Sequence, residues 1–152
     1  MLVPNIRFDA QTCLNGFWEV AGMLAVESCA ADPMEFSDDD PDAGMPEGFA
    51  PSCVEYCNAR LLACWQEFGE RYQELNPDSR DATPGNFGCD YFLTCEGHGT
   101  GFWDVHHADP DEWRALCVDV LTPRCHADGE FEFYAGDDRL IYCMAQYRAE
   151  TE

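Results

Sequence analysis

Hydrophobic residues recur every three or four positions from about residue 9 to residue 29. The apolar positions are Leu14, Phe17, Trp18, Ala21, Leu24 and Ala25. Because an α-helix turns once in about 3.6 residues, this spacing places them on one face and predicts an amphipathic helix. Two glycines, Gly16 and Gly22, weaken the pattern. The next segment, 31–50, is rich in Asp, Pro and Gly and predicts an exposed acidic loop within the same domain.

The clearest helical pattern lies between Ser52 and Leu75. Ser52 and Glu55 are three positions apart, as in a capping box, and Asn76-Pro77 ends the pattern. The apolar positions follow at steps of three and four: Cys57, Leu61, Cys64, Phe68, Tyr72 and Leu75. At about 100° per residue, the thiols of Cys53, Cys57 and Cys64 fall within an arc of about 40°. All three are therefore expected to face the same neighbouring element.

The middle of the chain changes pattern twice. Residues 89–95 are short, aromatic and bounded by two cysteines six positions apart, which predicts a strand with both thiols on one face. Asp109-Pro110 is a favourable helix start, and Thr122-Pro123 is expected to end that helix. Its apolar face consists of Trp113, Leu116, Cys117, Val120 and Leu121.

The last segment has the pattern of a hairpin. Polar and apolar residues alternate over 130–135, a Gly-Asp-Asp-Arg turn follows, and 140–144 is again apolar. Residues 145–152 are polar and predict a tail that frays. The whole pattern predicts one α+β domain over 1–152, with three helices packed on one side of a small antiparallel sheet formed by 89–95, 130–135 and 140–144.

The charge of the chain restricts its partners. Thirty Asp and Glu residues oppose eight basic residues, all of them Arg, and the formal net charge is −22. Such a field repels phosphates, so direct binding to nucleic acid or anionic lipid is not expected. The acidic surface either binds a basic protein partner or serves solubility alone. No segment approaches the ~20 apolar residues of a membrane span, and the first residues lack the pattern of a secretory signal.

The cysteine content predicts covalent stabilisation. An even number of cysteines is spread over nearly every predicted element, which is typical of a disulfide framework, and at least three disulfides are expected. The three thiols on the second helix are expected to bond to Cys13 or Cys29 and to Cys89 or Cys95. The alternative is that the cysteines are reduced and act as small apolar core residues. The disulfide candidates are Cys13, Cys29, Cys53, Cys57, Cys64, Cys89, Cys95, Cys117, Cys125 and Cys143.

The order of these segments resembles a family of small tailed-bacteriophage proteins. The resemblance rests on Asp90-Tyr-Phe-Leu-Thr94, Gly97-His-Gly-Thr-Gly-Phe-Trp-Asp104, Phe133-Tyr-Ala-Gly-Asp-Asp138 and Leu140-Ile-Tyr142. It implies a phage origin and a similar architecture, but no biochemical activity. Cys95-Glu96 and the high cysteine content depart from the family pattern, which suggests a need for extra covalent stability.

The segment 97–107 carries the densest set of reactive side chains. Its candidates for a metal site are His98, Asp104, His106 and His107, with Asp109, Cys95 and His126 as further donors suited to Zn²⁺. The spacing matches no standard zinc motif, and neither a P-loop nor a Gly-x-Ser-x-Gly elbow is present. The competing interpretation, which we favour, is a structural corner in which Phe102 and Trp103 are buried and at least two of the four histidines are exposed.

Three functions are compatible with the sequence. The first is a non-enzymatic virion-associated protein, such as a capsid decoration or cement protein, whose disulfides form outside the cell and which needs no cofactor. The second is an acidic, DNA-mimicking phage protein that binds and inhibits a basic protein in the host cytoplasm. The third is a metal-dependent enzyme that uses the 98–107 loop. The thiols discriminate between the first two, because the virion protein should lack free thiols and the inhibitor should retain most of them.

Overall fold

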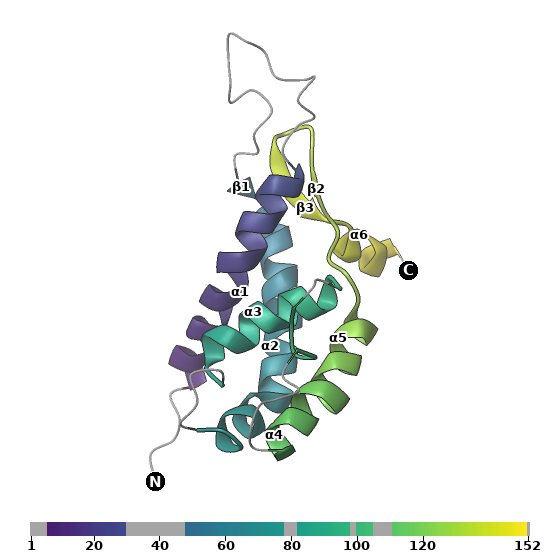
Figure 1. Cartoon of the computed structure of the whole chain (residues 1–152). Helices are drawn as coiled ribbons and strands as arrows, with labels where there is room; N and C mark the ends of the chain where they lie inside the picture. Colours follow the sequence, from purple (N-terminus) through teal and green to yellow (C-terminus); the bar gives the residue numbers. More distant parts are fainter. Residues whose placement is uncertain (1–5, 30–47, 78–81, 98–99, 105–110, 152) are drawn as a thin grey trace. The chain divides into compact units, whose positions relative to one another are not determined.

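The computed structural model describes residues 6–29, 48–77, 82–97, 100–104 and 111–151. For residues 6–9, 26–29 and 151 it describes the backbone alone. The fold class is α+β: most of the described chain is helical, and three short strands form one mixed sheet (Figure 1). The contacts divide the chain into two compact units, one formed by 1–21 and 58–130 and the other by 22–57 and 131–152. Most of the predicted acidic loop, 31–47, lies outside the described residues.

The two long predicted helices are confirmed. Helix α1 spans Ile6–Cys29 and helix α2 spans Pro51–Glu74. Both run through the two units, each contributing one part to the first and one part to the second. Ser52 lies inside α2, and not at its cap, because the helix begins one residue earlier and the amide of Val54 donates to the carbonyl of Ala50.

The predicted strand over 89–95 is wrong, because these residues form the second half of helix α3, Pro84–Cys95. The Thr83 hydroxyl accepts a hydrogen bond from the amide of Asn86 at 3.1 Å, and proline occupies the first turn, where its missing N–H costs nothing. With that start, Phe87, Tyr91 and Cys95 follow at steps of four and are buried. Cys89 is half-buried and does not share their face.

The helix predicted to end at Thr122-Pro123 continues through it. Helix α4 (Asp111–Ala115) leads into the π-helical segment η2 (Leu116–Leu121) and then into α5 (Thr122–Asp128), while Asp109 and Pro110 lie outside the described residues. The amide of Thr122 donates to the carbonyl of Cys117, five residues back, and its hydroxyl donates to the same carbonyl at 2.8 Å. The wider π turn admits Pro123 at the start of α5, where no backbone donor is needed.

Aromatic rings dominate the core of the first unit. Phe17 of α1 packs edge-on against Phe92 of α3, with ring centroids 5.5 Å apart. A second group surrounds Tyr72 of α2 and consists of Trp65, Phe87, Phe102 and Trp113, all buried. Edge-to-face pairs of this kind contribute about 0.5–1.5 kcal/mol beyond the area that they bury. These rings hold α2, α3 and α4 together.

The second unit contains the sheet. Strands β2 (Phe133–Ala135) and β3 (Leu140–Cys143) form the predicted antiparallel hairpin. The third strand is β1 (Gly48–Phe49), which pairs parallel to β3 and lies in the segment predicted as loop, so the sheet is mixed and not wholly antiparallel. Its core is Ala25 and Ile141, against which Phe49 and Phe133 pack.

The predicted polar tail is instead helix α6, Met144–Thr151. It begins directly after β3, where the amides of Met144 and Ala145 donate to the carbonyls of Glu132 and Phe131. Arg148 on α6 forms an ion pair with Glu132. These contacts fix the start of the helix against the hairpin.

Candidate functional site

The crossing of α1 and α3 has the geometry of a binding groove. Its helix backbones touch: a Cβ on Gly16 would lie 2.0 Å from the carbonyl oxygen of Gly85, and one on Gly88 would lie 2.0 Å from the carbonyl oxygen of Cys13. Such close approach is open only to glycine. A groove of about 350 Å³ runs beside the contact, and we call it the α1–α3 groove. Its lining residues are Thr12, Asn15, Gly16, Glu19, Val20, Gly85, Asn86 and Cys89.

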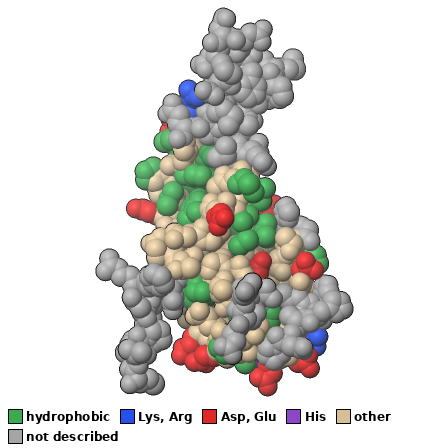
Figure 2. Space-filling model, turned by 60° about the vertical axis from the view of Figure 1, so that its left-hand side comes forward, with side chains coloured by type: hydrophobic (Ala, Val, Ile, Leu, Met, Phe, Trp, Pro, Cys, Tyr) green, Lys and Arg blue, Asp and Glu red, His purple; other side chains and the backbone are tan. Residues whose placement is uncertain are grey.

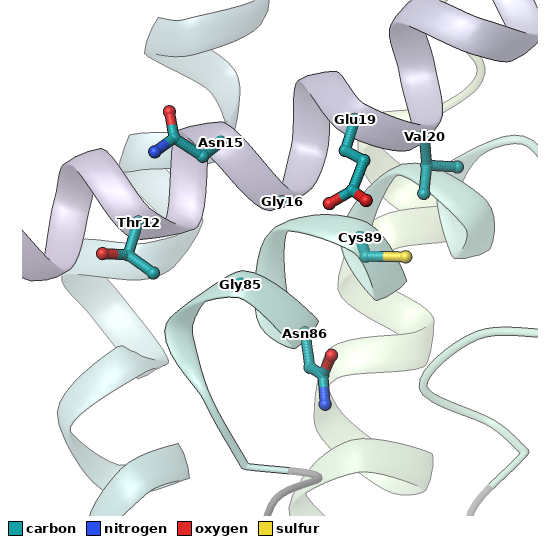
Figure 3. Close-up of a pocket in the computed structure, with 8 residues that line it drawn as sticks. All are labelled: Thr12, Asn15, Gly16, Glu19, Val20, Gly85, Asn86 and Cys89. Atoms are coloured by element: carbon teal, nitrogen blue, oxygen red, sulfur yellow. The ribbon is translucent and has the colours of Figure 1, made fainter.

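The groove carries hydrogen-bonding groups and one carboxylate. Figure 3 shows Glu19 reaching from α1 toward α3, next to Cys89. The amide oxygen of Asn15 accepts a hydrogen bond from Gln11 at 3.0 Å. Burial, followed by the negative charges of Asp90 and Glu19, raises the pKa of the Cys89 thiol. Cys89 is therefore protonated at neutral pH and is a poor nucleophile. The groove is suited to holding a cationic or hydrogen-bonding group.

A polar network connects α2, α3 and α5 within the same unit. The Tyr91 hydroxyl donates to Asp128 at 2.7 Å, and Arg60 donates to that hydroxyl at 3.4 Å and to the carbonyl of Gly129 at 2.6 Å. Arg124 extends the network through ion pairs with Asp128 and Glu67. Burial is the main cause of the raised Tyr91 pKa, so this phenol stays neutral. The network joins the three helices through hydrogen bonds and ion pairs.

The described cysteines are free thiols, and no two sulfurs lie at bonding distance, so the structure does not support the predicted disulfide framework. Eight of them are buried, with Cys89 half-buried, as expected of small apolar core residues. Cys53, Cys57 and Cys64 are all buried, but the prediction that they face the same neighbouring element is wrong. Cys57 lies near Cys143 of β3 in the second unit, whereas Cys64 lies near Cys95 of α3 in the first. Cys29 belongs to the residues whose side chains the structure does not describe.

The thiols gather in two groups. In the second unit, Cys143 and Cys53 are the neighbours that raise the pKa of the Cys57 thiol, and the Cys143 sulfur donates to the carbonyl of Phe131 at 3.0 Å. In the first unit, Cys95 and burial raise the pKa of the Cys125 thiol. Burial raises the pKa of the Cys64 thiol from its ordinary 9.0 to about 12. The thiols of Cys57, Cys64 and Cys125 are therefore neutral at physiological pH.

The predicted metal ligands fall largely outside the described residues. His98, His106 and His107 are among those not described, as is Asp109. Asp104 is exposed and accepts a hydrogen bond from the Thr100 hydroxyl at 3.2 Å. Across the described ranges, no three His, Cys, Asp or Glu side chains are arranged to hold a metal ion. The metal site therefore remains a prediction.

The corner interpretation of the same loop is confirmed in its main contact. Phe102 is fully buried, and its amide donates to the buried Thr94 hydroxyl at 2.9 Å. A Cβ on Gly101 would lie 2.3 Å from that hydroxyl, so glycine lets the turn approach α3. Trp103, however, is half-buried, so its predicted burial is met only in part. Of the histidines, His126 is described and exposed.

Acidic side chains predominate on the described surface, as they do in the composition. Of the six arginines whose side chains are described, Arg114, Arg124 and Arg148 are ion-paired with carboxylates. In Figure 2, red carboxylates recur over the described part of the face and blue groups are few. The exposed acids of the described residues are Glu19, Glu55, Glu67, Glu70, Glu74, Asp104, Asp111, Glu112, Asp119, Glu130, Asp137, Asp138 and Glu150. A helix long and apolar enough to cross a membrane is not found among the described residues.

No family model matches the chain, and the searches of curated proteins and of solved structures gave no match. The likeness to phage proteins thus stays a prediction from the sequence. The α1–α3 groove and the thiol groups were missed by sequence reasoning. Their signals were the glycines at positions 16, 85 and 88 and the cysteines at steps of four and seven, which become informative only when the partner helix is known.

Proposed function

We propose that this chain is a non-enzymatic acidic protein that binds a basic surface of a partner protein, as a mimic of nucleic acid would. The observation that carries the proposal is the charge: −22 for 152 residues, with most of the described carboxylates exposed and Arg114, Arg124 and Arg148 paired with carboxylates. A surface of this kind attracts a basic partner, accelerates their encounter and excludes acidic competitors.

The state of the thiols favours this function over that of a virion component. A capsid decoration protein was expected to have its cysteines in disulfides, whereas an inhibitor acting in the host cytoplasm was expected to keep them reduced. The nine described cysteines are free. The virion function therefore loses the covalent stabilisation on which it mainly rested.

The α1–α3 groove is the place where a cationic side chain of the partner is best accommodated. Glu19 supplies the carboxylate, which Figure 3 shows reaching from α1 toward α3. The glycine contact holds the two helix backbones together beside the groove. Arginine suits such a groove, because its planar guanidinium donates two parallel hydrogen bonds to a carboxylate.

The proposal is tested by competition. A fluorescently labelled DNA duplex is bound to a purified bacterial histone-like nucleoid protein, and the acidic chain is added while the anisotropy of the duplex is followed. Displacement at 50 mM salt that weakens strongly by 500 mM is expected, because salt screens the attraction. Absence of displacement at 50 mM, with the chain in large excess over the nucleoid protein, would refute the proposal for basic partners of this class.

A matched pair of variants separates the groove from the general field. Glu19→Gln and Glu55→Gln each remove one exposed negative charge from a helix, but only Glu19 lines the groove. If the groove receives a cationic side chain, Glu19→Gln weakens displacement by at least threefold more than Glu55→Gln. Equal effects would show that the binding depends on net charge alone and would remove the groove from the proposal.

A further inference from the structure

We propose that the stacked rings of Tyr134 and Tyr142 on the hairpin, together with the carboxylate of Asp138, receive an arginine side chain of a basic partner. The inference deepens the proposed function and rests on it for the class of partner. The residues that carry it belong to the second unit, whereas those of the α1–α3 groove belong to the first. The hairpin surface is therefore a separate contact point, which can be tested by itself.

The two faces of the hairpin carry different side chains. Phe133 of β2 and Ile141 of β3 belong to the core of the second unit. Successive side chains of a strand alternate between its faces, so Tyr134 and Tyr142 lie on the opposite face. The register places these two tyrosines directly across from each other. Because Tyr134 is 37 % exposed, this face presents an aromatic surface to solvent.

The Tyr142 ring is held in place by its neighbours. Its centroid lies 5.8 Å from that of Tyr134, and the two ring planes are 24° apart. Its hydroxyl donates to the carboxylate of Asp138 at 2.5 Å. A Cβ on Gly136 would lie 2.7 Å from the Tyr142 ring, so glycine lets this ring lie against the turn. The stack is thus ordered before a partner arrives, which reduces the entropy lost on binding.

Asp138 supplies a negative charge beside the rings. One carboxylate oxygen accepts the hydrogen bond of the Tyr142 hydroxyl, and the other accepts that of the Leu140 amide at 3.0 Å. Each oxygen has a second lone pair and the residue is exposed, so both oxygens can also accept from a ligand. Asp137 and Arg139 flank Asp138, and these two carboxylates and one guanidinium leave the turn with a net charge of −1.

Aromatic rings beside a carboxylate suit arginine better than lysine. A guanidinium is planar, stacks on an aromatic face and donates two parallel hydrogen bonds to a carboxylate. An ammonium is a compact, strongly hydrated point charge that cannot make this combination of contacts. Attraction by the general field of the chain would treat the two cations alike. A preference for arginine is therefore the signature of the hairpin surface.

The test titrates the full chain with two peptides, acetyl-Gly-Ser-Arg-Ser-Gly-amide and the same peptide with lysine in place of arginine. Binding is followed by NMR through the ring protons of Tyr134, which report on the hairpin and not on the groove. The arginine peptide is expected to bind at least threefold more tightly, and its δ-methylene protons should shift upfield over the ring. Equal binding of the two peptides, or unchanged Tyr134 ring protons with peptide in large excess, would overturn the proposal.

Two matched pairs of variants locate the contact, each made together with Glu19→Gln so that the groove carboxylate does not bind the peptide. Tyr134→Thr should abolish the arginine preference, whereas Tyr147→Thr, which removes an exposed ring from α6, should retain it. Asp138→Asn should weaken arginine binding at least threefold more than Asp137→Asn, which removes the same charge. Arginine preference retained in Tyr134→Thr, or equal effects of the two asparagine variants, would contradict the assignment. The wild-type titration decides the matter even if a variant fails to fold.

The peptide titration and the competition with DNA can fail independently. Competition that succeeds while the two peptides bind alike would remove the hairpin surface and leave the proposed function in place. An arginine preference at Tyr134 without competition would support the hairpin surface and refute the proposed function for nucleoid proteins.

Discussion

Replacing Gly16 by alanine tests whether the backbone contact of α1 with α3 builds the groove. The new Cβ would lie 2.0 Å from the Gly85 oxygen, 2.6 Å from its carbonyl carbon and 2.7 Å from its Cα. Ordinary contacts begin at about 3.4 Å, so the helices must separate by more than 1 Å. All three atoms belong to backbone, and no side chain can rotate away to relieve the clash.

The magnitude follows from two opposing terms. Alanine in place of a helical glycine gains about 0.5–1 kcal/mol of unfolding free energy, whereas overpacking of this kind costs about 1–3 kcal/mol. Because the obstacle is rigid, the cost lies at the upper end, and a net loss of about 2 kcal/mol is expected. Gly22 in the same helix supplies the control, since a Cβ there meets nothing within 4 Å. Gly22→Ala should therefore stabilise the chain by about 0.5–1 kcal/mol.

Urea denaturation followed by circular dichroism measures both effects. The two midpoints should shift in opposite directions at unchanged slope. Adding Gly88→Ala to Gly16→Ala should cost less than the sum of the single changes, because helices already parted accommodate the second methyl. Equal stabilisation by Gly16→Ala and Gly22→Ala would refute the direct contact.

Three further changes test the network, the thiols and the hairpin. Tyr91→Phe removes the donor to Asp128 and should lower the unfolding free energy by about 1–3 kcal/mol in urea denaturation, whereas an unchanged midpoint would show that the network is dispensable. Burial raises the folded-state pKa of Cys117 from 9.0 to about 12, so the unfolded chain loses this proton first and stability should fall as pH rises from 9 toward 12. Cys117→Ala should reduce that fall in melting curves. An identical fall would contradict the assignment of the effect to Cys117. The Tyr142 hydroxyl and the Leu140 amide donate to Asp138 and lower its pKa, so the carboxylate should titrate below 3.8 by NMR. The hairpin should weaken as pH falls from 3.8 toward that lower value, because the unfolded chain takes up the proton first. Tyr142→Phe should return the titration toward 3.8, and an unchanged titration would contradict the role of this hydroxyl.

The long helices were predictable because their patterns are local. In α2, the burial of Cys57, Leu61, Cys64 and Tyr72 follows directly from their spacing, as the 3.6-residue period requires. The hairpin was predictable for the same reason, since alternation and a Gly-Asp-Asp-Arg turn specify two paired strands. In each case, the segment carries its own periodicity and its own end signals.

Helix α3 was missed because seven residues are too few to distinguish the two periods. Over 89–95, an even spacing of six between two cysteines fits one face of a strand, and the aromatic residues also favoured the strand. The information lay upstream, in Thr83 and Pro84, which cap the helix. Strand β1 has only two residues and exists because Gly48 and Phe49 pair with β3, about ninety residues later. Tertiary pairing of this kind leaves no local pattern.

The groove could not be predicted, because it depends on which glycines meet. In the sequence, Gly16 appears only to weaken a helix, and Gly85 and Gly88 precede the segment predicted as a strand. Once α3 is a helix, the three glycines lie at one crossing. The missing side chain that lowers the helix propensity of glycine is also what allows the two backbones to touch. The glycines that argue against α1 in isolation are thus the residues that position it.

The cysteines contribute to this protein chiefly as core residues. Eight of the 26 buried hydrophobic residues that the structure describes are cysteine, against five leucines and isoleucines. Most of the described thiols therefore lie inside, while the carboxylates that would meet a partner lie outside. Because Glu19→Gln leaves every thiol in place, a loss of competition with DNA in that variant reports on the surface carboxylate and not on the core.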